Sequence, residues 1–324
     1  MDFIKKIICC FFIVIVSLGM FASVGSASAV KYVKSWGSEL DTSKLLRTPV
    51  AMARDAKGFL YVVDMGNNRI LKIDKNGEVV DAIGTLDEGP GQFNMPFGIA
   101  VDKEGNILVA DTANYRIQKF NEEFQFIKSW GTKGKGSEQF SFPREIAVDS
   151  DNNYYITDEY NHRIQKFNPF FVYMKEWGRK GSGEGEFFQP MQLAIDSKDN
   201  VYVVDRINNR VQKFDNEGNF LTKWGTNHGA GNLDPLENWR EGSGDLFLPI
   251  GIEIDINNTI YVTDTSNNRV NIYNENGNFL ESFGSFNGMS GQFFSPQGID
   301  VDSQGNIIIT DGLLQRIQFF KKAN

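Results

Sequence analysis

The chain has 324 residues, of which 41% are hydrophobic and 13% aromatic, so it is long enough to bury a sizeable core. Its net charge of −8 and its evenly spread lysine and arginine residues exclude a nucleic-acid-binding protein that depends on a basic surface. Its two cysteines, Cys9 and Cys10, lie in an N-terminal hydrophobic run, so disulfide and thiol chemistry are excluded for the rest of the chain.

The first element along the chain is an export signal. Lys5 and Lys6 precede an apolar run over residues 7–21, and the sequence ASA at residues 27–29 is typical of a cleavage site. We predict a signal peptide over residues 1–29, a mature chain that begins at Val30, and an exported protein, whether secreted, periplasmic or bound at the cell surface. The alternative is an uncleaved membrane anchor, although the run is shorter than the about 20 residues of a spanning helix.

Six copies of one motif follow, each with an aspartate and, five residues later, an arginine. The fourth copy reads VDRINNRVQKF from Val204 to Phe214. Copies are 47 residues apart, except for one spacing of 59 that reflects a 12-residue insertion within residues 225–249. A period in this range is typical of solenoids, propellers and other repeat arrays. The repeated pairs are Asp64 and Arg69, Asp111 and Arg116, Asp158 and Arg163, Asp205 and Arg210, Asp264 and Arg269, and Asp311 and Arg316.

Each repeat contains four short apolar or alternating runs that are separated by turn residues. In the second repeat these runs are residues 98–102, 106–111, 116–120 and 126–131. Short strands joined by tight turns predict a four-stranded antiparallel blade, and repetition of such blades predicts a propeller. An open solenoid is the alternative, but it would have atypical polar caps at both ends.

The two ends of the mature chain predict how the ring closes. Residues 31–37, KYVKSWG, match the fourth strand of a repeat, whereas the terminal RIQFFKK matches a third strand. We therefore predict that the N-terminal strand completes the last blade, which also protects strand edges. Residues 30–324 then form one all-β domain, a six-bladed β-propeller of four-stranded antiparallel blades.

In these repeats the chain resembles the NHL-repeat family, whose blades are close to P-x-G-I-A-V-D, N-I-Y-V-x-D-x-x-N-x-R-I-Q-K-F and W-G. The resemblance extends over essentially all of residues 30–324 and implies the propeller fold. It implies little about function, because related NHL-type propellers bind proteins, carry RNA on basic faces or host metal-dependent chemistry.

Residues that recur in every blade are predicted to serve the scaffold. We expect each Asp–Arg pair to form a bidentate, charge-assisted ion pair inside its blade. Repeated asparagines suit left-handed turn positions, and repeated tryptophans suit packing between blades. They are Asn67, Asn114, Asn161, Asn208 and Asn267, and Trp36, Trp130, Trp177 and Trp224.

Function is expected where the blades differ. Blades three and four carry large or charged residues just after the repeated proline and just after the repeated aspartate. In a meander the second-to-third turn and the blade-to-blade connection emerge on one face, so these residues should surround the channel mouth. The predicted ligand-binding rim comprises Arg144, Glu145, Glu159, Tyr160, His162, Met191, Gln192 and Arg206, with Phe97 and Gln297 completing it and Trp239 and Arg240 as a lid.

The alternative for this face is that its residues have diverged without a function, with Arg144 paired to Glu159, or Arg206 to Glu145, across neighbouring blades.

The sequence contains few signatures of a catalytic site. After residue 29 the chain has two histidines and no cysteine, too few for a zinc site with three nitrogen or sulfur ligands. There is no G-x-S-x-G elbow. No cofactor is predicted, and calcium held by carboxylates in the central channel is the ion that the composition could accommodate.

These observations favour a non-enzymatic role. We expect an exported, monomeric, rigid binding module for an extracellular protein, peptide or glycan, with no nucleic-acid partner and no stable membrane insertion after signal cleavage. The alternative is a hydrolase or lyase that uses a divalent cation in the central channel, with Glu145 or Glu159 in acid–base roles. A third hypothesis, a structural protein of the cell envelope, predicts no discrete pocket.

Overall fold

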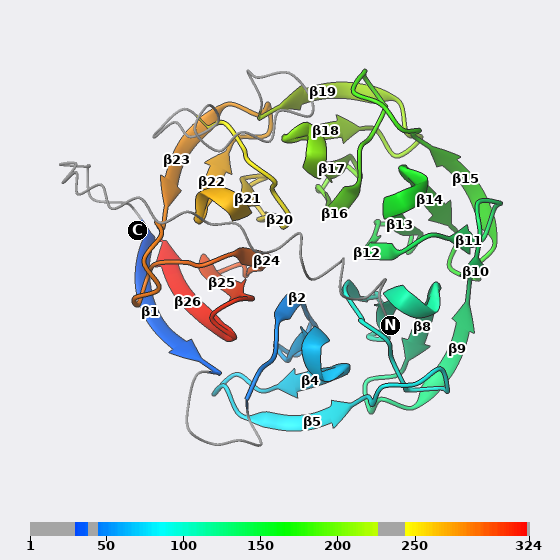
Figure 1. The fold of residues 1–324 in the computed structure, drawn as a ribbon, viewed down its shortest axis with the longest axis horizontal. Helices are drawn as coiled ribbons and strands as arrows, with labels where there is room; N and C mark the ends of the chain where they lie inside the picture. Colours follow the sequence, from blue (N-terminus) through cyan, green and yellow to red (C-terminus); the bar gives the residue numbers. More distant parts are fainter. Residues whose placement is uncertain (1–29, 38–44, 226–243, 323–324) are drawn as a thin grey trace, which may run out of the picture.

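The computed structural model describes residues 30–37, 45–225 and 244–322. These residues form six four-stranded antiparallel sheets, arranged as blades around a central channel (Figure 1), and contain no α-helix. The prediction of an all-β, six-bladed propeller is confirmed. The predicted signal peptide and the predicted lid residues Trp239 and Arg240 lie outside the described residues. Across the described ranges, no helix is long and apolar enough to cross a membrane.

The strands run from the channel outward in each blade. Blade one comprises β2 (Pro49–Arg54), β3 (Leu60–Asp64), β4 (Arg69–Ile73) and β5 (Val79–Ile83). Blade two comprises β6 (Ile99–Val101), β7 (Ile107–Asp111), β8 (Arg116–Phe120) and β9 (Phe126–Trp130). Blade three comprises β12 (Pro143–Val148), β13 (Tyr154–Asp158), β14 (Arg163–Phe167) and β15 (Tyr173–Trp177). Blade four comprises β16 (Pro190–Ile195), β17 (Val201–Asp205), β18 (Arg210–Phe214) and β19 (Phe220–Trp224). Blade five comprises β20 (Ile252–Ile254), β21 (Ile260–Asp264), β22 (Arg269–Tyr273) and β23 (Phe279–Phe283). Blade six comprises β24 (Pro296–Val301), β25 (Asn306–Asp311), β26 (Arg316–Lys322) and β1 (Val30–Trp36). A two-stranded ribbon of β10 (Thr132–Lys133) and β11 (Gln139–Phe140) lies between blades two and three.

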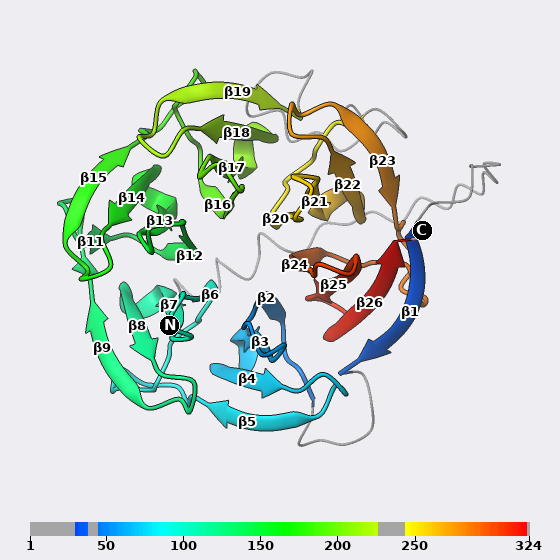
Figure 2. The same ribbon diagram turned by 180° about the vertical axis from the view of Figure 1, so that it is seen from behind.

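The N-terminal strand closes the ring as predicted. β1 pairs antiparallel with β26, with Trp36 opposite Ile317, so the last sheet has the order β1-β26-β25-β24. Both views of the ribbon place blue β1 along the outer edge of red β26 (Figures 1 and 2). The outer edge of β26 is therefore paired, which removes an exposed template for strand addition.

A one-turn 3-10 helix joins the second and third strands in five blades. These helices are η1 (Met65–Asn67), η2 (Thr112–Asn114), η3 (Glu159–Asn161), η4 (Arg206–Asn208) and η5 (Thr265–Asn267). The prediction that their asparagines are left-handed is wrong by one residue, because the following residue, such as Asn209 at φ 55°, has the positive φ. The asparagine instead ends the helix and binds the repeated aspartate, as Asn208 Nδ2 donates to Asp205 Oδ2 at 2.8 Å.

Neighbouring blades pack face to face through aromatic side chains. The Trp177 ring at the end of blade three lies 6.1 Å from the Tyr155 ring in its own blade and 6.0 Å from the Phe214 ring in blade four. Trp224 bridges Tyr202 and the next blade in the same way. Packing of these tryptophans between blades is confirmed, and it joins the sheets into one rigid ring.

All six Asp–Arg pairs form, with N–O distances from 2.7 Å in Asp64–Arg69 to 3.4 Å in Asp311–Arg316. Their geometry differs from the bidentate pairing that we expected. In blade four, Arg210 uses only Nε on Asp205 Oδ2, while Asp205 Oδ1 accepts the Phe188 backbone N–H at 2.7 Å. The remaining guanidinium N–H groups are taken by backbone carbonyl oxygens of the same blade-to-blade loop. Each pair therefore clamps the loop that precedes an innermost strand.

The innermost strands of some neighbouring blades approach each other so closely that glycine is needed at particular positions. A Cβ on Gly251 would lie 2.0 Å from the Gln297 carbonyl oxygen, and one on Gly98 would lie 2.1 Å from the Arg144 carbonyl oxygen. Both neighbours are backbone atoms of the next blade, so relief requires a shift of one blade against another.

We expect Gly251→Ala to lower the free energy of unfolding by about 2 kcal/mol, because the new methyl group overpacks against backbone. Urea unfolding monitored by tryptophan fluorescence measures the change. The matched control is Gly136→Ala, whose Cβ would approach only the side chain of Gln139. Equal stability of the two variants would show that the blades can separate at this level without cost.

Candidate functional site

The 3-10 helices and the blade-to-blade loops lie on one face of the disc, which we call the η face. The backbone N–H of Tyr160 in η3 donates to Ser141 O at 3.0 Å, and that of Ile207 in η4 donates to Phe188 O at 3.1 Å. Each helix is therefore bonded to the loop that enters its own blade. This arrangement places the 3-10 helices of blades three and four, and with them the divergent residues Glu159, Tyr160 and Arg206, on the same face.

Four of the predicted rim residues form a charged cluster on this face, here called the η-face cluster: Arg144, Glu159, Tyr160 and Arg206. Arg144 Nε lies 2.5 Å from Glu159 Oε2, so this pair joins two residues of blade three rather than neighbouring blades. The Arg144 guanidinium also lies over the Phe97 ring, 4.6 Å from its centroid. Tyr160 is 45% exposed, which makes it the accessible aromatic surface of the cluster.

Arg206 is the unsatisfied member of this cluster. Among the residues that the structure describes, its guanidinium makes no hydrogen bond or ion pair, and its Nε is buried without an acceptor. Burial lowers the pKa of Arg206, and the nearby positive charge of Arg144 lowers it further. The negative charge of Glu159 opposes this shift. An arginine still carries its charge at neutral pH, so a buried donor is left without a partner.

Apart from the contact of the Phe97 ring with Arg144, the remaining described rim residues do not join this cluster. Phe97 and Met191 are each 4% exposed and belong to the same buried apolar cluster as Val50 and Ile250. Gln297 is 9% exposed, and its backbone oxygen accepts the Thr263 hydroxyl at 2.7 Å.

His162 connects blade three to the loop that enters blade four. Its Nδ1 accepts the Gln189 backbone N–H at 3.1 Å, and burial lowers the pKa of its imidazole. In blade four, Asn209 Oδ1 accepts the Leu248 N–H in the same way at 2.8 Å. A neutral His162 therefore replaces a scaffold asparagine, which sequence comparison alone did not reveal.

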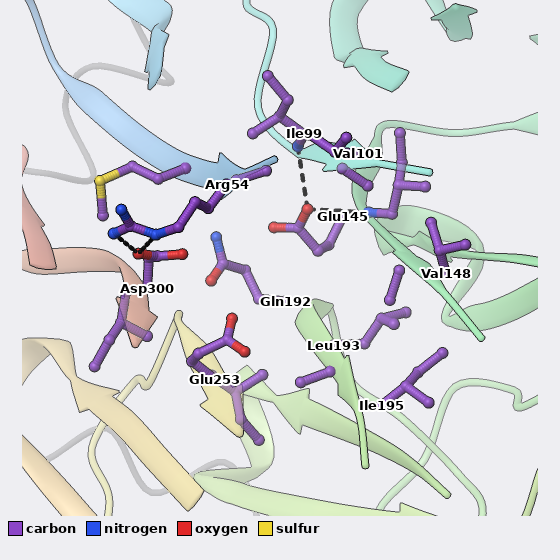
Figure 3. Close-up of a pocket in the computed structure, with 18 residues that line it drawn as sticks. Arg54, Ile99, Val101, Glu145, Val148, Gln192, Leu193, Ile195, Glu253 and Asp300 are labelled. Atoms are coloured by element: carbon purple, nitrogen blue, oxygen red, sulfur yellow. Dashed lines mark hydrogen bonds and ion pairs between the residues drawn. The ribbon is translucent and has the colours of Figure 1, made fainter. Parts of the chain in front are cut away.

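The central channel contains a cavity of about 280 Å³ that the innermost strands of all six blades line (Figure 3). Glu145 and Gln192 of the predicted rim point into it, together with Glu253 of blade five. On the adjoining wall, Arg54 Nη2 of blade one lies 2.5 Å from Asp300 Oδ2 of blade six. The polar lining therefore comes from five different blades.

Both channel glutamates hold protons unusually strongly. Burial, and for Glu145 the nearby Glu253, raise the pKa of Glu145 to about 8, although backbone N–H groups of Ile146 and Ile99 oppose the shift. Burial and the Asp300 charge raise the pKa of Glu253 to about 8. A carboxyl group with such a pKa can donate or accept a proton near neutral pH.

Sequence comparison missed Arg54, Glu253 and Asp300. The sequence difference that indicates Glu253 and Asp300 lies four residues after the repeated proline. Blades one to four have alanine at this position, whereas blades five and six have Glu253 and Asp300. The two residues directly after the proline, by contrast, point only to Glu145 and Gln192 of this site.

The channel residues do not fit a divalent cation well. Within residues 30–37, 45–225 and 244–322, no three histidine, cysteine, aspartate or glutamate side chains form a group that could hold a metal ion. The Asp300 charge is balanced by Arg54, and one oxygen of each channel glutamate is already held by backbone N–H groups, so the cavity offers fewer free oxygens than the roughly six to eight that calcium takes.

Comparison with known proteins identifies the repeats. The NHL repeat family matches residues 93–120 and 140–167, which lie in blades two and three. Two of the repeats are therefore similar to the NHL repeat, and the described residues form a six-bladed β-propeller. A comparison with the sequences of curated proteins finds no significant match.

Several solved structures share the architecture. Virginiamycin B lyase from Staphylococcus aureus with quinupristin is 18% identical, with 84% of this chain and 80% of that chain covered and a TM-score of 0.59. A gluconolactonase from Xanthomonas campestris is 14% identical, with 85% and 86% covered and a TM-score of 0.62. Hydrazine synthase from Kuenenia stuttgartiensis is 12% identical, with 86% and 96% covered and a TM-score of 0.59. At these identities the likeness establishes the fold alone.

Proposed function

We propose that this protein is a rigid binding module outside the cell, and that its η-face cluster holds a carboxylate of a protein or peptide partner. The observation that carries the proposal is the Arg206 guanidinium, which has no acceptor among the described residues. The side chain as a whole is only partly buried, so a ligand carboxylate can approach the guanidinium from solvent and supply the acceptor that the protein does not. Arginine presents its N–H groups in a planar fork that matches a carboxylate.

The neighbours of Arg206 suit a peptide side chain. Glu159 is already paired with Arg144, so the cluster retains one positive charge that is not balanced. The exposed Tyr160 ring, which packs edge-on against Phe142 at 5.0 Å, provides an aromatic contact beside that charge. Aromatic and arginine side chains often dominate the binding energy of protein interfaces.

The scaffold supports this role because it holds the cluster in place before a ligand arrives. The clamps at Asp158 and Asp205 fix the loops beside η3 and η4, and both carboxylates are completely buried. A preformed site loses little conformational entropy on binding.

The test is selection of peptides from a random display library against the purified protein. We expect the enriched peptides to carry Asp, Glu or a free C-terminal carboxylate. Arg206→Gln should weaken their binding tenfold or more in isothermal titration calorimetry, since a hot-spot arginine contributes about 2 kcal/mol.

Arg179→Gln is the matched control, because it removes the same charge from a side chain that is 81% exposed. Binding to it should equal binding to the unmodified protein. Enrichment of peptides without acidic groups, or equal affinity of the Arg206→Gln variant, would contradict the proposal.

The alternative proposal, a hydrolase or lyase with a divalent cation in the channel, has weaker support. Lyases and lactonases occur among proteins of this fold, but Arg54 already neutralises the Asp300 carboxylate here.

A further inference from the structure

We propose that the central channel is a second binding site, which takes a small aliphatic amine in its ammonium form. The site would be separate from the η-face cluster. Four of the six residues directly after the repeated prolines, Val50, Phe97, Met191 and Ile250, are at most 8% exposed and belong to one buried apolar cluster. The other two are Arg144 and Gln297. The four apolar residues precede the channel-lining residues along their strands, so a largely apolar layer lies between the η face and the cavity.

The cavity is lined by buried polar groups that point inward and keep hydrogen-bonding atoms without a protein partner among the described residues. Gln192 is 4% exposed and Glu145 is 7% exposed, yet both side chains reach the cavity (Figure 3). Within the described parts of the chain, the Gln192 amide makes no side-chain hydrogen bond. Buried amides are ordinarily hydrogen-bonded, so this group is expected to bind a ligand or water.

The acceptor pattern suits ammonium groups. Glu145 Oε1 accepts backbone N–H groups from Ile99 and Ile146 at 3.2 and 3.0 Å, and Glu253 Oε1 accepts one from Ile254 at 3.1 Å. One oxygen of each carboxyl is thus fixed by backbone, which leaves Oε2 for a ligand. An ammonium group has three donors and no acceptor, so it can bind single oxygens from different walls.

The charge balance favours a cation. Among the cavity-lining residues the charged side chains are Arg54, Glu145, Glu253 and Asp300, which gives a charge of −2 when all are ionised. Arg54 and Asp300 neutralise each other, so the excess lies on the two glutamates. A ligand cation would supply the partner that a buried carboxylate otherwise lacks.

The walls favour a short alkyl chain. Aliphatic residues line the cavity between the polar groups, and its volume of about 280 Å³ is at the lower end of the range for small-molecule sites. The small residues of this lining are Ala53, Ala100, Ala147 and Ala194. A compact ligand with an apolar chain and terminal ammonium groups therefore matches both features.

Isothermal titration calorimetry at pH 7.5 with 1,4-diaminobutane, n-butylamine and 1,4-butanediol tests the proposal. We expect the diamine to bind most tightly, the monoamine at least tenfold more weakly, and the uncharged diol not at all. Because the amine ionises Glu145 and Glu253, binding should release protons, which appears as a heat that changes with the ionisation enthalpy of the buffer.

The double variant Glu145→Gln, Glu253→Gln should lose diamine binding by at least tenfold and release no protons. Glu88→Gln, at an exposed site away from the channel, and Arg206→Gln, on the η face, should bind like the unmodified protein. Circular dichroism and thermal unfolding confirm that each variant is folded. Undiminished binding by the folded double variant, or binding of calcium ions in the absence of any diamine binding, would overturn the assignment.

Discussion

Replacing Asp205 with alanine will lower the free energy of unfolding by about 3–5 kcal/mol, because it leaves a buried guanidinium without its counterion. Asp205 is completely buried and accepts from Arg210 Nε, the Phe188 N–H and the Asn208 amide at 2.7, 2.7 and 2.8 Å. Arg210 is 4% exposed, so water cannot replace the carboxylate without opening the blade. Urea unfolding monitored by circular dichroism measures the loss.

Glu217→Ala is the control for this prediction. Glu217 pairs with Lys175 at 3.0 Å, but its side chain is 61% exposed. Removal of a solvent-exposed ion pair should cost less than about 1 kcal/mol. If Asp205→Ala destabilises the protein no more than Glu217→Ala does, the repeated Asp–Arg pairs are not clamps.

Raising the pH from 5 to 8 will destabilise the protein relative to its Glu145→Gln, Glu253→Gln variant by about 7 kcal/mol, of which each glutamate contributes roughly half. An unfolded glutamate has a pKa of about 4.3, whereas burial raises both channel pKa values to about 8. Between these values the folded state binds more protons than the unfolded state. The free energy of unfolding therefore falls as the pH rises through this window and levels off above pH 8.

The other charged groups facing this pair are Asp300 and Arg54, from β24 and β2, and Asp255, which follows β20. The innermost strands β6 and β16 contribute no charged group to the cavity lining. Glu88→Gln serves as the control and should keep the pH dependence of the unmodified protein. Parallel pH profiles for the unmodified protein and the double variant would show that the channel carboxyl groups titrate normally.

The two proposed sites make the disc functionally asymmetric. The η-face cluster is suited to a partner's carboxylate, because its excess charge is the Arg206 guanidinium. The channel cavity has the opposite character, with Glu145 and Glu253 as its excess charges. Variants of one site should therefore leave the ligand of the other unaffected, which allows each proposal to fail separately.

The sequence predicted that Glu145 and Gln192 belong to a binding site, but it placed them at the channel mouth and not in the central cavity. Glu145 and Gln192 were singled out because they replace small residues, and we expected them at the mouth with Arg144 and Met191. Strand alternation sends neighbouring residues to different environments. Glu145 therefore enters the cavity, Met191 is buried among apolar residues, and Arg144 binds Glu159.

The sequence by itself determined the architecture of this protein. A 47-residue period, turn residues at fixed places and a fourth-strand motif at Lys31–Gly37 were sufficient for six blades and the closing strand, because each blade repeats the same local requirements. Only the tertiary structure decided which divergent residues meet. Ring closure brings Arg54 to Asp300 across 246 residues and places Glu145 near Glu253, and no local pattern encodes those distances. The scaffold was predictable since it is repeated, whereas each site arises once, where different blades converge.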